Sequence, residues 1–400
     1  MAGSRRKPGN LGPHIQGMQS RLQTLGYTPD TIRNMLKVVG QVGRWLQSEE
    51  LTIADLDESA VDVFITARRD AGYRQIQNRD VFTELLGHLR ALGATPNAMI
   101  PTPTAVQLLV AQYRRWLFDE RDLASTTVLR YENLARRFLT GDQPAGPLID
   151  LSLLTGVRVS AFILAESRRV SLGSARGRVA ELRSLLRYLY ISERVASDLS
   201  TCVPSVAGWK DAHLPVSVSP AHVEMMVASC DSTNPTGRRD RAILLLLARL
   251  GLRSIEVARL QLEDIDWRAG EIEVRGKGRH RDRMPLPVEV GEALAQYLQD
   301  GRPSCSHRMV FVTERAPRKP IPADLVGDVV RRACWRGGWP VVPAHRLRHA
   351  LATDLLAKGT PLVDISQVLR HRDLATTAIY AKVDMLSLRL VAQPWPGQKS

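Results

Sequence analysis

Cysteine is scarce in this chain, and its few copies lie far apart. The 400 residues contain 4 cysteines, with no CxxC pair and no histidine partner at the spacing of a zinc site. A disulfide framework and a zinc module are therefore not predicted. We expect the cysteines to be reduced and structural, as in cytosolic proteins. They are Cys202, Cys230, Cys305 and Cys334.

Long apolar runs are also missing. The longest, Ala242 to Ala248, is far shorter than the ~20 residues that span a bilayer as a helix. The N-terminal string MAGSRRKPGN carries charge with no apolar stretch behind it, which argues against a secretory signal. The sequence predicts a soluble, cytoplasmic protein.

Acidic residues are outnumbered by basic ones. The chain has 55 Lys and Arg against 41 Asp and Glu, giving a net charge of +14 and a pI near 10.1. Such an excess favours a polyanionic partner, because neutralising phosphates releases condensed counterions. Charge alone does not separate DNA from RNA or from an anionic membrane.

Proline and polar clusters divide the chain. One lies at residues 94–104 and a longer one at residues 203–220. At ~100–200 residues per domain, the length predicts two to four domains. We expect domains at residues 1–98, 105–202 and 214–400, with residues 203–213 as a linker.

The first two segments have helical patterns. Thr31 to Trp45 and Arg178 to Ile191 each place apolar residues on one face, and Ser125 or Thr126 is a candidate cap for another helix. Residues 53–65 resemble residues 148–163 at an offset of about 95–98 positions. Two related helical modules would explain this resemblance, and chance similarity between amphipathic helices is the competing explanation.

The third segment predicts helices around one small sheet. A buried helix from Asp240 to Leu250 ends at Gly251, and a short helix follows from Ser254 to Leu260. Glu271 to Arg275 alternates like a strand, and Met284 to Pro287 is the expected return strand. Beyond it the pattern is helical almost to Leu390. The predicted fold class is mainly α (α+β), with a small antiparallel sheet.

Basic residues near this sheet are the first candidates for phosphate chemistry. Arg253 follows the glycine that ends a buried helix, where a guanidinium suits an anion. Glu256, one turn on, either orients Arg253 or is a surface charge. Lys277, between two glycines at the expected hairpin tip, can counter phosphate charge and protonate a leaving oxygen. A basic cluster around it should contact DNA-backbone phosphates: Arg275, Arg279, Arg281 and Arg283.

A second group of candidates lies further along the chain. His345 and Arg348 are three residues apart and share a face of a predicted helix. His371 follows a later helix, and Tyr380 lies nine residues beyond it. A cation, imidazoles and a phenol on one surface would allow tyrosine to attack a phosphodiester, given a base for a group whose pKa is near 10. We expect the adjacent His349 to have a packing role.

The order of these residues resembles the tyrosine recombinase (phage integrase) family. The strings that carry the resemblance are GLRSIEVARL, VRGKGRHRDRMPLP, HRLRHALATDLLAKG and LRHRDLATTAIYAKV. They cover residues 214–390, and residues 105–202 resemble the family's core-binding domain more loosely. Residues 1–98 have no firm match, and an arm-site module, a duplicated core-binding half and a protein-contact domain all remain open.

The resemblance implies a C-shaped clamp on DNA and a defined chemistry. Tyr380 would attack the scissile phosphodiester, giving a 3′-phosphotyrosyl link and a free 5′-hydroxyl. Arg253 and Arg348 would stabilise the transition state with help from His371. Lys277 would protonate the 5′-oxygen, and His345 would exchange the proton of the phenol. No cofactor or metal is expected, in line with the lack of a Walker motif or acidic metal cluster in the sequence.

The resemblance also implies partners. We expect double-stranded DNA with inverted-repeat recombination sites, a homotetramer on two duplexes, and association with the nucleoid. The C-terminal residues 386–400 would dock on a neighbouring protomer or on their own domain. The large N-terminal segment favours an integrase or transposase of a mobile element over a chromosome resolvase. The alternatives are a type IB topoisomerase-like relaxase and a non-catalytic DNA-binding accessory protein.

Overall fold

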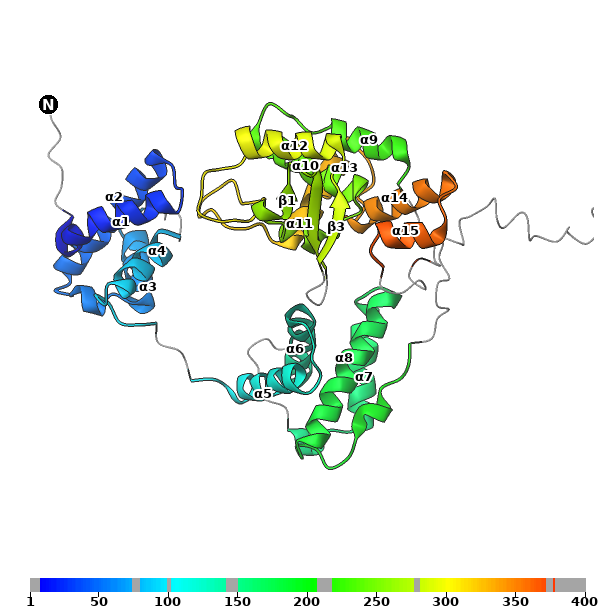
Figure 1. Cartoon of the computed structure of the whole chain (residues 1–400). Coiled ribbons are helices and arrows are strands. Elements are labelled where there is room, and N and C mark those ends of the chain that lie inside the picture. Colours follow the sequence, from blue (N-terminus) through cyan, green and yellow to red (C-terminus); the bar gives the residue numbers. More distant parts are fainter. Residues whose placement is uncertain are drawn as a thin grey trace, which may run out of the picture. The chain divides into compact units, whose positions relative to one another are not determined.

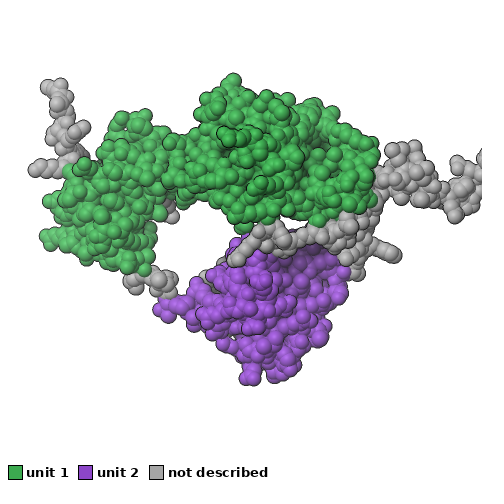
Figure 2. Space-filling view, in the orientation of Figure 1, with its two compact units in different colours: residues 1–98, 213–400 green, residues 99–212 purple. Residues whose placement is uncertain are grey.

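The computed structural model describes residues 8–73, 80–98, 102–141, 150–206, 218–276, 281–371 and 377 (Figure 1). The chain forms two compact units, one made of residues 1–98 and 213–400 and the other of residues 99–212 (Figure 2). Most of the described residues are helical, with one small antiparallel sheet, which confirms the predicted fold class. None of the helices in the described segments is long and apolar enough to cross a membrane.

Residues 8–98 form a helical cluster with its own apolar core. The longest helix begins where the Thr28 side chain accepts the amide of Thr31, followed by Pro29 at the first helical position. The predicted stripe on this helix is buried, including Ile32, Met35 and Val39. Its elements are the 3₁₀ helix Gly9–His14, α1 (Ile15–Thr24), α2 (Pro29–Ser48), the 3₁₀ helix Ile53–Asp55, α3 (Glu58–Asp70) and α4 (Asp80–Ala91).

Residues 102–206 form a second helical cluster around a separate core. The helix expected near residue 125 is present, but its predicted cap is wrong: Ser125 is the first helical residue, and the capping residue Ala124 has no side chain that can accept a bond. The elements are α5 (Ala105–Asp119), α6 (Ser125–Thr140), the 3₁₀ helix Leu151–Leu153, α7 (Gly156–Arg168), α8 (Leu172–Ile191) and the 3₁₀ helix Leu199–Cys202.

The two segments that resemble each other in sequence also have the same local structure. In each, a 3₁₀ turn, at Ile53–Asp55 or Leu151–Leu153, leads into a helix of 13 residues, α3 or α7. A side-chain oxygen caps each helix, from Asp57 in one case and Thr155 in the other. This agreement fits two related modules, although amphipathic helices after capped turns also arise independently.

Residues 218–371 surround one buried helix. Its elements are α9 (Pro220–Ala228), α10 (Pro235–Arg249), α11 (Ser254–Ala258), the 3₁₀ helix Leu262–Asp264, β1 (Ile265–Asp266), β2 (Glu271–Arg275), β3 (Arg281–Pro285), α12 (Val288–Asp300), α13 (Ala323–Arg336), α14 (His345–Ala357) and α15 (Leu362–Val368).

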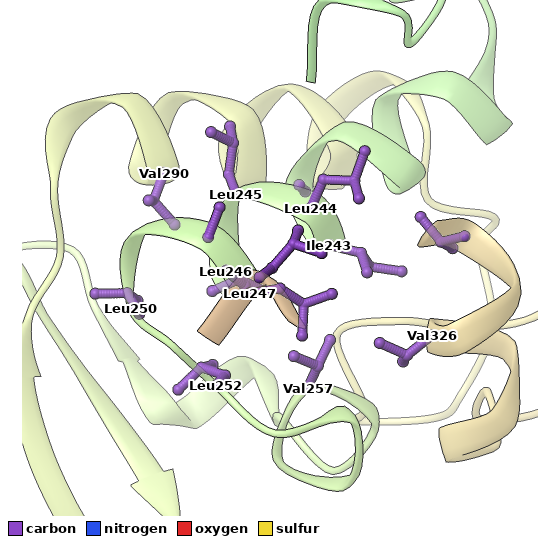
Figure 3. Close-up of a cluster of buried hydrophobic side chains, with 14 of the residues drawn as sticks. Ile243, Leu244, Leu245, Leu246, Leu247, Leu250, Leu252, Val257, Val290 and Val326 are labelled. Atoms are coloured by element: carbon purple, nitrogen blue, oxygen red, sulfur yellow. The ribbon is translucent and has the colours of Figure 1, made fainter. Parts of the chain in front are cut away.

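Helix α10 is the centre of this part of the fold. It packs against α9, α11, α12, α13 and α14. Its residues from Ala242 to Leu247 are at most 1% exposed. Figure 3 shows those from Ile243 to Leu247 among side chains of the surrounding elements. A helix that is apolar on all sides must be covered on all sides. The predicted start of this helix at Asp240 is wrong, because α10 begins at Pro235, where the Asn234 side chain caps it. Its buried C-terminal end leads to Arg253.

The predicted hairpin is present. Strand β2 matches the expected residues, and the return strand β3 begins earlier than predicted, at Arg281. The two strands are antiparallel, with Ile272 opposite Met284 and Arg275 opposite Arg281, and β1 pairs with the other edge of β2. The hairpin tip, with Lys277, lies outside the described residues.

The expectation of helix almost throughout residues 288–390 is wrong for one described segment. Residues 301–322, between α12 and α13, are irregular and make two isolated bridges, Gln261 with Met309 and Val312 with Pro320. Buried Val310, Phe311 and Val312 lie in this segment. Three consecutive apolar residues do not separate a buried extended segment from a helix, which explains the error.

We predict that Leu246→Ala lowers the free energy of unfolding by ~2–5 kcal/mol, because it removes fully buried methyl groups and leaves a cavity in α10. Urea unfolding of the intact protein would measure this change. Val288→Ala is the control, since Val288 is 76% exposed and its truncation should cost less than ~0.5 kcal/mol. Equal effects of the two substitutions would contradict the central position of α10.

Candidate active site

Arg253 lies in the turn between α10 and α11. Gly251 allows the sharp change of direction with a φ of +58°, and Arg253 is the capping residue of α11. Its guanidinium donates to Glu256 Oε1 at 2.6 Å, and its backbone N–H donates to Glu256 Oε2 at 2.9 Å. The side chain of Arg253 stays 45% exposed, whereas that of Glu256 is only 2% exposed. The buried carboxylate of Glu256 therefore orients the guanidinium of Arg253, which stays accessible to solvent.

Arg348 links this turn to another. It lies on α14, is 7% exposed, and donates one guanidinium N–H to the carbonyl of Gly251 and another to the carbonyl of Leu369. Gly251 precedes Arg253 by two residues, and Leu369 precedes His371 by two. One buried side chain therefore holds together the two turns that carry other candidate residues.

The second turn is a Schellman motif at the end of α15. The N–H of Arg370 donates to the carbonyl of Gln367 at 2.9 Å, and the N–H of His371 donates to that of Ser366 at 2.9 Å. Arg370 has a φ of +54°. This left-handed conformation costs a non-glycine residue about 1–2 kcal/mol. The turn presents His371, whose Nδ1 lies 2.7 Å from the hydroxyl oxygen of the buried Thr377.

Glu256 connects the two turns a second time. Arg370 Nη2 donates to Glu256 Oε2 at 2.9 Å, and the Arg370 side chain is 7% exposed. Burial alone would raise the pKa of Glu256, but the bond from the Arg253 amide and the charges of Arg370 and Arg253 outweigh it and lower this pKa. Glu256 is therefore ionised, and two guanidinium groups share its charge.

Histidines close to these arginines are neutral near pH 7. Burial, followed by the charges of Arg348 and Arg253, lowers the pKa of His371 to about 4. Burial and the neighbouring His345 lower the pKa of His349 to about 4 as well. Burial and the charge of Arg346 lower the pKa of His345. A neutral imidazole both donates and accepts a hydrogen bond, so these groups are suited to proton exchange.

His345 and His349 lie one turn apart on α14. Their ring centroids are 5.5 Å apart in an edge-to-face arrangement. His349 also contributes to lowering the pKa of His371. It therefore packs, as expected, but it also lies within electrostatic reach of His371.

The three described arginines of the hairpin each have a carboxylate partner. Arg275 donates to the buried Asp264 at 2.7 Å, and Arg281 donates to Glu273 at 2.9 Å. Arg283 lies 3.9 Å from Glu271. The side chains of Arg281 and Arg283 are 62% and 74% exposed, so solvent screens these pairs and leaves the arginines accessible to a stronger anion.

The structure brings together Arg253, Glu256, Arg348 and His371. His345 contacts His349, which lies within electrostatic reach of His371. Lys277, Arg279 and Tyr380, which the sequence also singles out, lie outside the described residues.

Arg370 and Thr377 also belong to the cluster, and neither is among the candidate residues named from the sequence. Arg370 has a recognisable signal, because an arginine stands where a helix of this kind usually ends in glycine. The partnership of Thr377 with His371 has none, because it depends on how the chain folds back.

Comparison with known proteins assigns the family. Residues 217–386 match the model of the phage integrase family. The "Putative integrase/recombinase y4rA" of Sinorhizobium fredii is 36% identical over 99% of this chain and 97% of its own length. The tyrosine recombinase XerD of Vibrio cholerae is 30% identical over 69% of this chain and 92% of its own. This chain belongs to the phage integrase family of tyrosine recombinases.

Solved structures show the same fold. The XerH site-specific recombinase bound to a palindromic difH substrate matches with a TM-score of 0.52 and 17% identity, over 74% of this chain and 98% of that one. A lambda integrase (75-356) dimer bound to a COC' core site matches with a TM-score of 0.52 and 15% identity, over 73% and 98%. At these identities the likeness supports the fold alone.

We predict that Gly251→Ala is more destabilising than Gly270→Ala. Both glycines have positive φ, so each substitution should cost ~1–2 kcal/mol of unfolding free energy. A methyl group at Gly251 would also lie 2.9 Å from Leu369 Cδ2 and 3.1 Å from Leu351 Cδ2, whereas nothing lies within 4 Å at Gly270. Crowding should add ~1–3 kcal/mol at Gly251. Equal losses of unfolding free energy in the two variants would show that Gly251 is not closely packed against Leu369 and Leu351.

The histidines also predict a pH dependence. Their pKa values in the folded state lie below the ordinary 6.5, near 4 for His349 and His371, so the unfolded chain binds more protons between these values. Stability due to these groups is complete above pH 6.5 and is lost as the pH falls towards 4. His349→Gln should make the decrease between pH 6.5 and 5 shallower. Unfolding curves at several pH values would test this, and an unchanged slope would contradict it.

Proposed function

We propose that this protein is a site-specific DNA recombinase that cuts and rejoins DNA through a 3′-phosphotyrosyl intermediate. Family membership supports the reaction class. The observation that carries the proposal for this chain is the convergence of Arg253, Arg348 and His371 through bonds that join their two turns. Such a group of donors suits a phosphoryl centre that gains negative charge in its transition state.

The proposed chemistry conserves bond energy. The Tyr380 oxygen attacks the phosphorus, its proton passes to His345 or to water, and the bond to the 5′-oxygen breaks. Lys277 gives a proton to that oxygen, which leaves as a 5′-hydroxyl. Attack by a 5′-hydroxyl of a partner duplex reverses each transfer and frees the tyrosine.

The arginines and His371 act on the phosphate itself. Arg253 is partly exposed and oriented by Glu256, so it is placed to hold a non-bridging oxygen. Arg348 lends its buried charge and fixes the turn of His371. When Thr377 donates to Nδ1 of His371, the ring proton lies on Nε2 and is available to the phosphate.

The basic hairpin and the helical domains would hold the DNA. We propose phosphate contacts for Arg275, Arg279, Arg281 and Arg283, supported by the net charge of +14 and by the exposure of the described members. Residues 105–202 would act as a core-binding domain. Residues 1–98 would supply an arm-binding or contact domain.

Family membership also supports a proposal for assembly and biological role. We propose a homotetramer on two duplexes with inverted-repeat sites, in which residues 386–400 dock on a neighbouring protomer. The match to y4rA extends over 99% of this chain, including the N-terminal segment, whereas the match to XerD of Vibrio cholerae covers 69%. The shared extra length supports a role in integration or transposition of a mobile element.

The alternatives are less well supported. The reported relatives and neighbours are recombinases and integrases, which does not favour a relaxase or a non-catalytic accessory protein. Exchange between two labelled duplexes, as opposed to relaxation of a single plasmid, would separate a recombinase from a relaxase.

We predict that a nicked suicide duplex traps covalent protein–DNA with the wild type and none with Tyr380→Phe, because only the phenol oxygen can form the ester. The duplex should come from the inverted repeats at the ends of the element that encodes the protein. Adducts would be measured on denaturing gels. Tyr73→Phe is a matched control that should trap normally, since Tyr73 lies outside the catalytic and core-binding segments and is 53% exposed. Adducts with Tyr380→Phe, or none with wild type on a bound site, would overturn the proposal.

A further inference from the structure

Arg370 occupies a backbone position that suits glycine. It is the left-handed residue of the Schellman motif after α15, with a φ of +54°. Three other non-glycine residues of the described segments have positive φ, namely Glu50, Asp122 and Glu193, and all three are exposed. Arg370 instead directs its side chain inward, where it is 7% exposed. Contacts of this side chain must offset the unfavourable backbone conformation.

These contacts lead to the other half of the site. The guanidinium of Arg370 donates to Glu256 Oε2 at 2.9 Å and lies 3.5 Å from the carbonyl oxygen of Leu250, at the end of α10. Glu256 in turn binds both the guanidinium and the amide of Arg253. Arg370 therefore reaches Arg253 through a single shared carboxylate.

The charges of Arg253, Glu256 and Arg370 indicate what Arg370 does. Glu256 carries one negative charge, and its only other guanidinium partner among the described residues is Arg253. Without Arg370, Arg253 and Glu256 would form a neutral pair, and the pull of Arg253 on a phosphate would weaken. With Arg370 present, the carboxylate keeps its orienting bonds, but the group retains a net positive charge.

We propose that Arg370 is a positioning residue for DNA cleavage: it neutralises Glu256, so that Glu256 orients Arg253 without cancelling its charge. This inference rests on the proposed recombinase function. Arg370 itself does not touch the DNA in this arrangement, and it acts only through Glu256 and Arg253.

The main variant is Arg370→Gly, which suits the left-handed backbone and removes only the side chain. Single-turnover cleavage of the nicked duplex should become about 10-fold to 100-fold slower, the effect of losing one charge-assisted hydrogen bond. DNA affinity should change less than about 3-fold, because Arg370 is one buried residue among many basic ones. Arg370→Lys, which keeps the charge, should retain most of the rate.

Glu193→Gly is the matched control. Glu193 ends α8 in the same Schellman geometry, with its N–H on the Tyr190 carbonyl and that of Arg194 on Leu189, and it is exposed. Its replacement should raise the melting temperature by about 2–4 °C, which measures the effect of relieving this backbone strain alone. The control separates relief of backbone strain from loss of a side-chain function.

A double variant distinguishes positioning from simple structural support. Glu256→Gln removes the charge that Arg370 neutralises, so Arg370→Gly/Glu256→Gln should cleave at least about 3-fold faster than Arg370→Gly alone. A residue that only stabilises the fold predicts a double variant as slow as the single variant or slower. That result, or wild-type cleavage by Arg370→Gly, would overturn the inference. Failure of the wild type to cleave would instead count against the proposed function.

Discussion

The buried guanidinium of Arg348 is the interaction on which the rest of the site depends. Its bonds to the carbonyls of Gly251 and Leu369 join two turns that are far apart in sequence. Arginine suits this position because its planar group is always charged and offers five N–H donors in a fixed geometry. Lysine has one side-chain nitrogen, so it could not replace the two guanidinium nitrogens that bond to these carbonyls and still place its charge near a phosphate.

Burying such a charge is unfavourable unless its surroundings compensate for it. Carbonyl dipoles do this for Arg348, and the ionised Glu256 does it for Arg370. Arg253 and Arg370 share one described carboxylate, that of Glu256. These three side chains therefore carry a net positive charge, which an anionic phosphate would satisfy.

Sequence predicted the parts of this site that follow local rules. The helix expected from Asp240 to Leu250, the glycine after it and the strand Glu271–Arg275 have strong periodic or turn signals, and all are present, although the helix begins earlier than expected, at Pro235. The buried extended segment around Phe311 was not predictable, because a short apolar run fits either kind of element. The partnership of Thr377 with His371 was not predictable, because it depends on how the chain folds back. Arg370 was visible only as an arginine where helices often end in glycine, and its contact with Glu256 is visible only in the fold. The spacing of the charged residues in the sequence identified Arg253 and Glu256 as candidates. Only the fold shows that Arg253 and Arg370 share the carboxylate of Glu256.

Hydrogen exchange of backbone amides in the free protein would test the central claim most directly, namely that Arg348 holds the two turns together before DNA binds. The amides to follow are those of Leu252, which donates to Leu246, and His371, which donates to Ser366. In wild type both should be protected to a similar degree, and in Arg348→Lys both should lose protection together while α12 keeps its own. The His371 amide could exchange as fast as a frayed helix end in wild type, or its exchange rate could stay the same in Arg348→Lys. Either result would mean that the two turns are independent and that the account is wrong.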